Sequence, residues 1–215
     1  MTATKEPSRS ERKRRAILAA AEELFLRNGY LGTSMDELAE RSEVSKQTVY
    51  AHFGSKESLF VELVSSMTAG AGDGLHDRDE PPAPDGDVAG YLTRYAADEL
   101  SVVMTPRLLK LRRLVIGEVE RFPDLARALY ENGPARAIRS LAVTMASLTE
   151  RGLLGADDPV EAATTFNWLV MGAPMNEAML LGDGAVPDAG ALQRHAAHVT
   201  RVFLAAYGAA GDGVR

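Results

Sequence analysis

Two short helical patterns joined by a tight turn constrain this chain more than any other feature of its sequence. The first pattern begins at Ser34, and Glu37 follows three positions later, which is the spacing of a capping box at a helix N-terminus. The second pattern begins at Ser45, a residue suited to an N-cap, and Gly54 ends it. Patterns this short and this close together predict a helix-turn-helix unit.

The second short helix carries polar side chains on its predicted outer face. They are Lys46, Gln47, Thr48, Tyr50 and His52. Val49 and Phe53 point toward the predicted core. A small helix whose exposed face offers donors, a phenol and positive charge is suited to entering the major groove of DNA rather than to catalysis. Ser34, Ser45 and Lys56 lie at helix starts, where free amides attract anions, so we expect them to seat phosphates.

This segment resembles the N-terminal domain of the tetracycline-repressor (TetR) family of bacterial transcription regulators. The resemblance extends over about residues 12–67. It rests on Gly29–Tyr30, Thr33–Ser34, Leu38–Ala39 and the run 44–53 with 55–57. The motif and the resemblance together predict one set of DNA-contacting residues. This set is Thr33, Ser34, Ser45, Lys46, Gln47, Thr48, Tyr50, His52 and Lys56.

The turn between the two short helices departs from the family pattern. The family usually has Ala-Gly where this chain has Ser42-Glu43. Position 43 is predicted to be left-handed, a conformation that glycine adopts most easily. A side chain there costs about 1 kcal/mol, which the fold can tolerate.

The net charge of −6 is unusual for a protein that binds DNA. The first 60 residues carry ten basic and nine acidic side chains, whereas the remaining residues carry fourteen and twenty-one. Residues 5–15 hold six basic and two acidic side chains, which predicts a basic N-terminal arm that contacts phosphates. The alternative is that these residues only begin a solvated helix. We expect the acidic remainder to face away from DNA.

The rest of the chain shows apolar residues at helical spacing and no strand pattern, so the predicted fold class is all-α. We expect a helix-turn-helix DNA-binding domain over residues 1–54, which includes the basic arm, and a C-terminal helical bundle over residues 55–215. Residues 71–87 are rich in Gly, Pro and Asp and are predicted to form a flexible loop inside this second domain.

The resemblance implies that the second domain binds a small-molecule effector and holds a homodimer together through its last two helices. The predicted ligand-binding residues are Met104, Leu108, Leu111, Val115, Asn167, Trp168, Met171 and Met175. The predicted dimer-interface residues are Phe166, Val170, Val199 and Phe203. For both sets the alternative is a place in the core of the subunit itself. Methionine adapts its shape, which suits a promiscuous apolar site.

The sequence predicts a DNA-binding transcriptional regulator, a repressor that a small, largely apolar effector releases from a palindromic operator. No nucleotide-binding, nucleophile-elbow or zinc-protease motif is present, so we expect no enzyme activity and no cofactor. His195 and His198 lack a third partner, so we expect no metal site. With no cysteine and no membrane-spanning run, we expect a cytoplasmic protein that does not bind membranes. The alternative is a small-molecule-binding protein or adaptor that does not read DNA.

Overall fold

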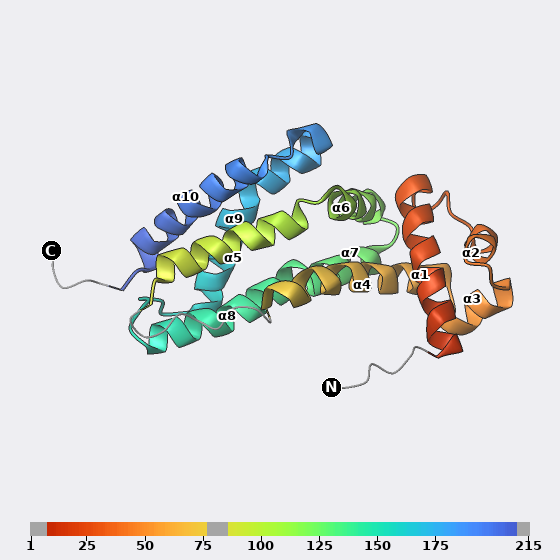
Figure 1. Cartoon of the computed structure of the whole chain (residues 1–215), viewed down its shortest axis with the longest axis horizontal. Helices are drawn as coiled ribbons and strands as arrows, with labels where there is room; N and C mark the ends of the chain where they lie inside the picture. The colour runs from red at the N-terminus through yellow and green to blue at the C-terminus, as the bar shows by residue number, and fades with distance from the viewer. Residues whose placement is uncertain (1–7, 77–85, 210–215) are drawn as a thin grey trace. The chain divides into compact units, whose positions relative to one another are not determined.

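The computed structural model describes residues 8–76 and 86–209, and these fold almost wholly into helices (Figure 1). The helices are α1 (Arg9–Asn28), α2 (Met35–Arg41), α3 (Lys46–Phe53), α4 (Lys56–His76), α5 (Val88–Val103), α6 (Pro106–Glu118), α7 (Pro123–Asn132), α8 (Pro134–Glu150), α9 (Pro159–Leu181) and α10 (Ala189–Tyr207). A 3₁₀ turn covers Asp183–Ala185. Within the described ranges there is no β-strand, so the predicted all-α class is confirmed.

The chain divides into two compact units. The first comprises Met1–Met67 with Lys110–Leu129, and the second comprises Thr68–Leu109 with Tyr130–Arg215. The boundary predicted after residue 54 separates the helix-turn-helix from the remainder and stays a prediction. Packing follows a different division, because the first half of α4 and a segment from much later in the chain join the helix-turn-helix. Sequence periodicity gave no sign of that long-range association.

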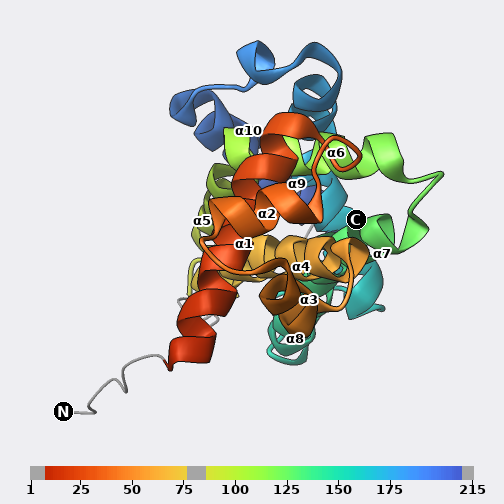
Figure 2. The ribbon, with the colours of Figure 1, turned by 90° about the vertical axis from the view of Figure 1, so that its right-hand side faces the viewer.

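In the first unit, α2 packs against α1 and α3 packs against α2 (Figure 2). Leu38 of α2 and Val49 of α3 are fully buried. The turn between these helices contains Glu43, the one residue other than glycine with a positive φ in the described residues, at 55°. The left-handed position predicted from the sequence is therefore confirmed. Ser42 before it is buried, and its hydroxyl donates to the Leu38 carbonyl, so its polar group has a partner.

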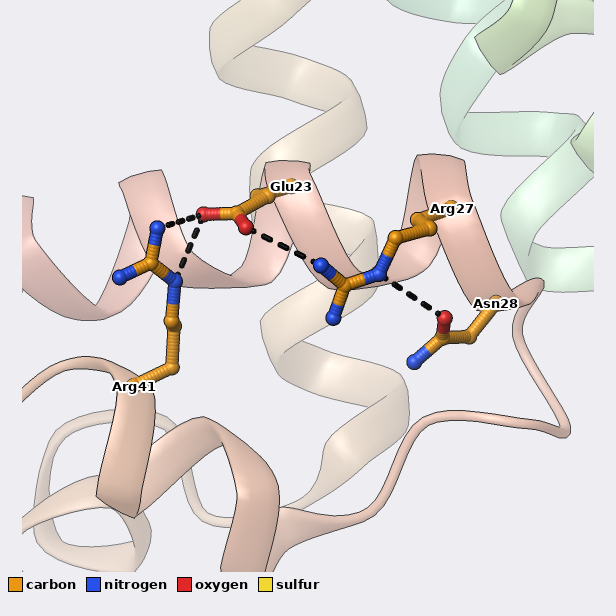
Figure 3. Close-up of polar contacts among 4 residues, drawn as sticks. All are labelled: Glu23, Arg27, Asn28 and Arg41. Atoms are coloured by element: carbon orange, nitrogen blue, oxygen red, sulfur yellow. Dashed lines mark hydrogen bonds and ion pairs between the residues drawn. The ribbon is translucent and has the colours of Figure 1, made fainter.

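An ion network ties the end of α2 to α1 (Figure 3). Glu23 Oε2 accepts hydrogen bonds from Arg41 at 2.6 Å from Nη2 and 2.8 Å from Nε. Glu23 Oε1 lies 3.3 Å from Arg27 Nη1. The hydrogen bond from Arg41 is the main cause that lowers the pKa of Glu23. Because these side chains are partly exposed to water, the ion pair between Arg41 and Glu23 adds little stability.

The predicted loop over residues 71–87 begins later in the structure than the sequence indicated. Helix α4 continues to His76, beyond the glycines that we expected to end it. A glycine inside a helix costs about 1 kcal/mol relative to alanine, and an upstream helix can carry that cost. Residues 77–85 of the predicted loop lie outside the described residues. Asp87 caps α5, because its carboxylate accepts from the Gly90 amide at 2.7 Å.

In the second unit, α5, α9 and α10 pack against one another and α8 packs against α9 (Figure 1). The core contains a ring cluster: the Phe166 ring lies 6.4 Å from the Tyr95 ring and 5.0 Å from the Phe203 ring, measured between centroids. Asp158 caps α9 and Asp188 caps α10 through hydrogen bonds to amides of the first turn. The apolar faces of all four helices meet in this one core.

Three polar side chains are also buried in the second unit. They are Glu99 on α5, Asn167 on α9 and Thr200 on α10, with 5%, 2% and 1% of their surface exposed. Burial raises the pKa of Glu99 to about 7. A carboxylate removed from water is strongly disfavoured, so the protonated form gains relative to the ionised form.

The burial of Glu99 predicts that folding stability falls as the pH rises through this window. Because its pKa is about 7 in the folded chain and about 4.5 when exposed, the folded state binds more protons between these values. The wild-type chain should therefore lose up to roughly 3 kcal/mol relative to Glu99→Gln between about pH 5 and about pH 8. Urea unfolding followed by circular dichroism measures this difference. Parallel pH profiles for the two proteins would contradict a buried, ionising Glu99.

Candidate functional site

Helix α3 is held by its apolar side, which leaves the opposite side free. Val49 is fully buried and Phe53 is 6% exposed, whereas Tyr50 is 44% exposed. Ser45 forms the N-cap, because its hydroxyl accepts from the Thr48 amide at 3.1 Å and lies 2.8 Å from the Thr48 hydroxyl. The cap predicted at Ser45 is confirmed.

The outer face of α3 combines fully exposed and half-buried polar side chains. Lys46 and Gln47 are exposed, whereas Thr48 and His52 are half-buried. Together with Tyr50 they follow the outer side of one two-turn helix, so the structure brings all five predicted residues of this helix together. These side chains offer hydrogen-bond donors and acceptors.

An acidic neighbour holds Lys46 within the protein. Lys46 Nζ lies 2.9 Å from Asp36 Oδ2, a residue in the first turn of α2. The hydrogen bond to Asp36 raises the pKa of Lys46. Both side chains are at least half exposed, so water and ions reach the pair. Sequence reasoning missed this partner, although Asp36 lies only two residues after the predicted cap at Ser34.

The residues before α2 differ in their availability to DNA. Ser34 is exposed and shares a capping box with Glu37: the Glu37 amide donates to Ser34 Oγ at 3.2 Å, and the Ser34 amide donates to Glu37 Oε2 at 2.9 Å. The predicted capping box is confirmed. Thr33, by contrast, is only 2% exposed, and its hydroxyl donates to the Gly29 carbonyl at 2.9 Å. Its side chain fixes the loop after α1 and is not free to contact DNA.

Lys56 at the start of α4 is half-buried on an aromatic ring. Its Nζ lies 4.6 Å from the centroid of Tyr30, a cation–π arrangement. Burial lowers its pKa. Tyr30 in turn packs against Phe122, and the two ring centroids are 4.5 Å apart. Phe122 lies between α6 and α7, so this segment supports the ring that Lys56 contacts.

One arginine of the predicted basic arm packs against other helices of the first unit. Arg14 forms an ion pair with Glu62 and lies over the Phe53 ring at 5.5 Å. This arginine therefore helps to hold α1 against α3 and α4. Residues 1–7 of the predicted arm lie outside the described residues.

The predicted ligand-binding residues are divided between the two units. Met104, Asn167, Met171 and Met175 are buried in the second unit, where the three methionines belong to one core cluster, and Leu108 is half-buried there. Leu111 and Val115 are buried in the first unit instead. Trp168 is 45% exposed on α9, so it does not line a buried site within the subunit.

The predicted dimer-interface residues are buried inside the subunit. Phe166 and Val170 are fully buried, Phe203 is 1% exposed and Val199 is 4% exposed. Their side chains form the core between α9 and α10, so the alternative of a place in the subunit core is correct for all four. The helical spacing marked them as inward-facing, but it could not tell a core from an interface.

The described part of the chain contains no group of three His, Asp or Glu side chains that could hold a metal ion. His195 has a different role, because its Nε2 lies 2.9 Å from the Val170 carbonyl oxygen and links α10 to α9. None of the helices described here combines the length and the apolar character that crossing a bilayer requires.

Two family models match the chain over most of its length. The model described as "Bacterial regulatory proteins, tetR family" matches residues 17–63. The model described as "AefR-like transcriptional repressor, C-terminal domain" matches residues 90–209, which is more than half of the chain. The first match includes the whole helix-turn-helix, and the second includes α9, α10 and the core between them.

Solved structures and curated relatives agree with these models. A protein from Mesorhizobium loti MAFF303099, assigned to the TetR-family transcriptional regulators, is 39% identical, with 94% of this chain and 100% of that chain covered and a TM-score of 0.84. The flavonoid-responsive regulator FrrA is 33% identical, with 93% and 99% covered and a TM-score of 0.76. The transcriptional regulator QacR of Staphylococcus aureus is 47% identical over 49 residues, only 23% of this chain and 26% of QacR. The chain belongs to the TetR family of bacterial transcriptional regulators.

Proposed function

We propose that this regulator is a homodimeric repressor that places α3 of each subunit in the major groove of a palindromic operator. The observation that supports this proposal is the division of α3 into a buried apolar side and an exposed polar side. Val49 is fully buried, while Tyr50 beside it is 44% exposed. Two-fold symmetry of a dimer matches two-fold symmetry of an operator, which accounts for the palindrome.

The residues of this surface have distinct proposed roles. Lys46 and Gln47 contact phosphates or base edges, and a good bidentate base contact is worth about 1–3 kcal/mol. Thr48, Tyr50 and His52 fix the register on the backbone or reach a base. Ser34, Ser45 and Lys56 seat phosphates, which position the protein without specifying a sequence. The exposure of Ser34 and Ser45 supports this role, whereas the burial of Thr33 removes it from the proposed set.

The proposed dimer uses the last two long helices through side chains other than those predicted from the sequence. Large apolar residues on α9 and α10 remain exposed in the subunit. They are Val160, Trp168, Leu180, Leu181 and Val202, each at least 45% exposed. Pairing of two copies would remove these side chains from water, which is favourable at about 25 cal/mol per Å² of apolar surface.

The proposed effector is a small, largely apolar molecule that binds in the second unit. Met104, Met171 and Met175 in its core can adapt their shape to such a molecule. FrrA, which matches this chain almost from end to end, is described as flavonoid-responsive, and this supports an aromatic effector. Effector binding need favour a DNA-incompatible arrangement by only about 1–3 kcal/mol to act as a switch.

Replacement of Tyr50 by alanine tests the docking of α3. Because the Tyr50 side chain is exposed and packs little, Tyr50→Ala should weaken operator binding about tenfold while leaving helicity and the dimer intact. Fluorescence anisotropy at a fixed salt concentration measures the affinity, and size-exclusion chromatography with light scattering checks the dimer. An unchanged affinity would remove α3 from the DNA interface.

Release of Lys46 from Asp36 should strengthen DNA binding. In Asp36→Asn the lysine keeps its charge but loses its ionic partner, and a negative charge leaves the DNA-facing surface. The logarithm of the binding constant should then fall more steeply with the logarithm of salt concentration, by about 0.9 in slope. Lys46→Ala added to Asp36→Asn should return the slope to about its wild-type value.

A matched control separates this local effect from net charge. Asp98→Asn on α5 removes the same charge from an exposed position in the second unit, and it should leave both affinity and salt slope unchanged. Equal slopes for Asp36→Asn and Asp98→Asn would show that Lys46 and Asp36 lie away from DNA.

A further inference from the structure

Three buried polar side chains in the second unit keep polar atoms without a hydrogen-bond partner. These atoms are Glu99 Oε2, Asn167 Nδ2 and Thr200 Oγ1, and we call the three residues the polar trio. Each residue is at most 5% exposed. An unpaired buried polar group costs about as much as a lost hydrogen bond, so native proteins contain few of them. Their occurrence on three helices that pack together requires an explanation.

Each member of the polar trio lies close in the sequence to one ring of a single aromatic cluster. Asn167 directly follows Phe166, Glu99 lies one helical turn after Tyr95, and Thr200 lies three residues before Phe203. The ring of Phe166 packs between those of Tyr95 and Phe203. Since one helical turn rises about 5.4 Å, each member of the trio lies within about one turn, along its own helix, of one ring of this cluster. The electrostatic influence of Glu99 on Tyr95, whose pKa it helps to raise after burial, agrees with this proximity.

The chemistry of the three unpaired atoms defines a complementary molecule. The Glu99 carboxylate accepts a hydrogen bond, the Asn167 amide nitrogen donates one, and the Thr200 hydroxyl can do either. A purely apolar ligand would leave all three unpaired. An organic cation would satisfy Glu99 and leave the Asn167 nitrogen unpaired. A molecule with both a hydroxyl donor and a carbonyl acceptor on an aromatic body satisfies the trio and matches the rings beside it.

We propose that the polar trio anchors the effector, and that the effector is a neutral aromatic molecule that carries a phenolic hydroxyl and a carbonyl oxygen. This inference rests on the proposed effector-controlled function and adds the ligand class and the residues that select it. The phenol donates to Glu99, the Asn167 amide donates to the carbonyl oxygen, and Thr200 takes the remaining polar contact. Met171, one turn after Asn167 on α9, supplies the adaptable apolar contact for the ring system.

Calorimetric titration of the full chain with two flavones tests this assignment. The probes are 5,7-dihydroxyflavone and unsubstituted flavone, which share their rings and carbonyl and differ only in the hydroxyls. The wild-type chain should bind the dihydroxy compound about tenfold more tightly, because its hydroxyl gives Glu99 Oε2 the hydrogen-bond partner that this buried atom lacks. Glu99→Gln should remove most of this preference, and its affinity for unsubstituted flavone should stay within about twofold of wild type.

Two matched variants make the result specific. Glu177→Gln removes an exposed carboxylate from α9 and should keep the full preference. Asn167→Leu should weaken both flavones, since each carries the carbonyl that the amide contacts. Equal wild-type affinity for both flavones, no heat of binding with either, or a preference that survives Glu99→Gln would overturn the proposal. So would tight binding of tetraphenylphosphonium that Glu99→Gln abolishes, because that result identifies a cation site.

Operator binding without any probe separates this inference from the function on which it rests. Wild type and Glu177→Gln should bind operator DNA equally, because Glu177 is an exposed residue of the second unit. If both bind DNA and neither distinguishes the flavones, only the ligand assignment fails. If the wild-type chain shows no sequence preference for DNA, the proposed function fails whatever the flavones do.

Discussion

The burial of one side of α3 is the constraint on which the rest of this structure depends. Val49 and Phe53 anchor the helix to its unit, and Ser45 fixes where it begins. With these three residues fixed, Lys46, Gln47 and Tyr50 are exposed to solvent, while Thr48 and His52 are half-buried. The turn before α3 contains a left-handed Glu43, so the chain tolerates local strain to keep two short helices at this crossing.

Most of this first unit could be predicted from sequence because its signals are local. A capping serine, a glutamate three residues later and a terminating glycine each act within one helical turn, and Ser34, Glu37 and Gly54 all have the expected roles. Thr33 shows where that reasoning fails. A threonine at this position reads as a polar surface residue, but its hydroxyl is bound to the Gly29 carbonyl inside the fold.

The second unit could be predicted less well, because the contacts that form its core join residues far apart in the sequence. Helical spacing correctly placed Phe166 and Phe203 on inward faces, but periodicity does not say which helix covers a face. Glu99 was overlooked although a signal existed: it follows Tyr95 by four positions and so puts a carboxylate on the apolar face of α5. A charge at an inward position is the observation that could have found it.

Selection of bound duplexes from random DNA tests most directly the claim that two copies of α3 read DNA. The account predicts enrichment of an inverted repeat, with half-sites whose centres lie about one helical turn, 10–10.5 base pairs, or a multiple of it apart. The selected duplex should bind two copies of the chain or a multiple of two. Enrichment of a single asymmetric site, or no enrichment at moderate salt, would contradict it.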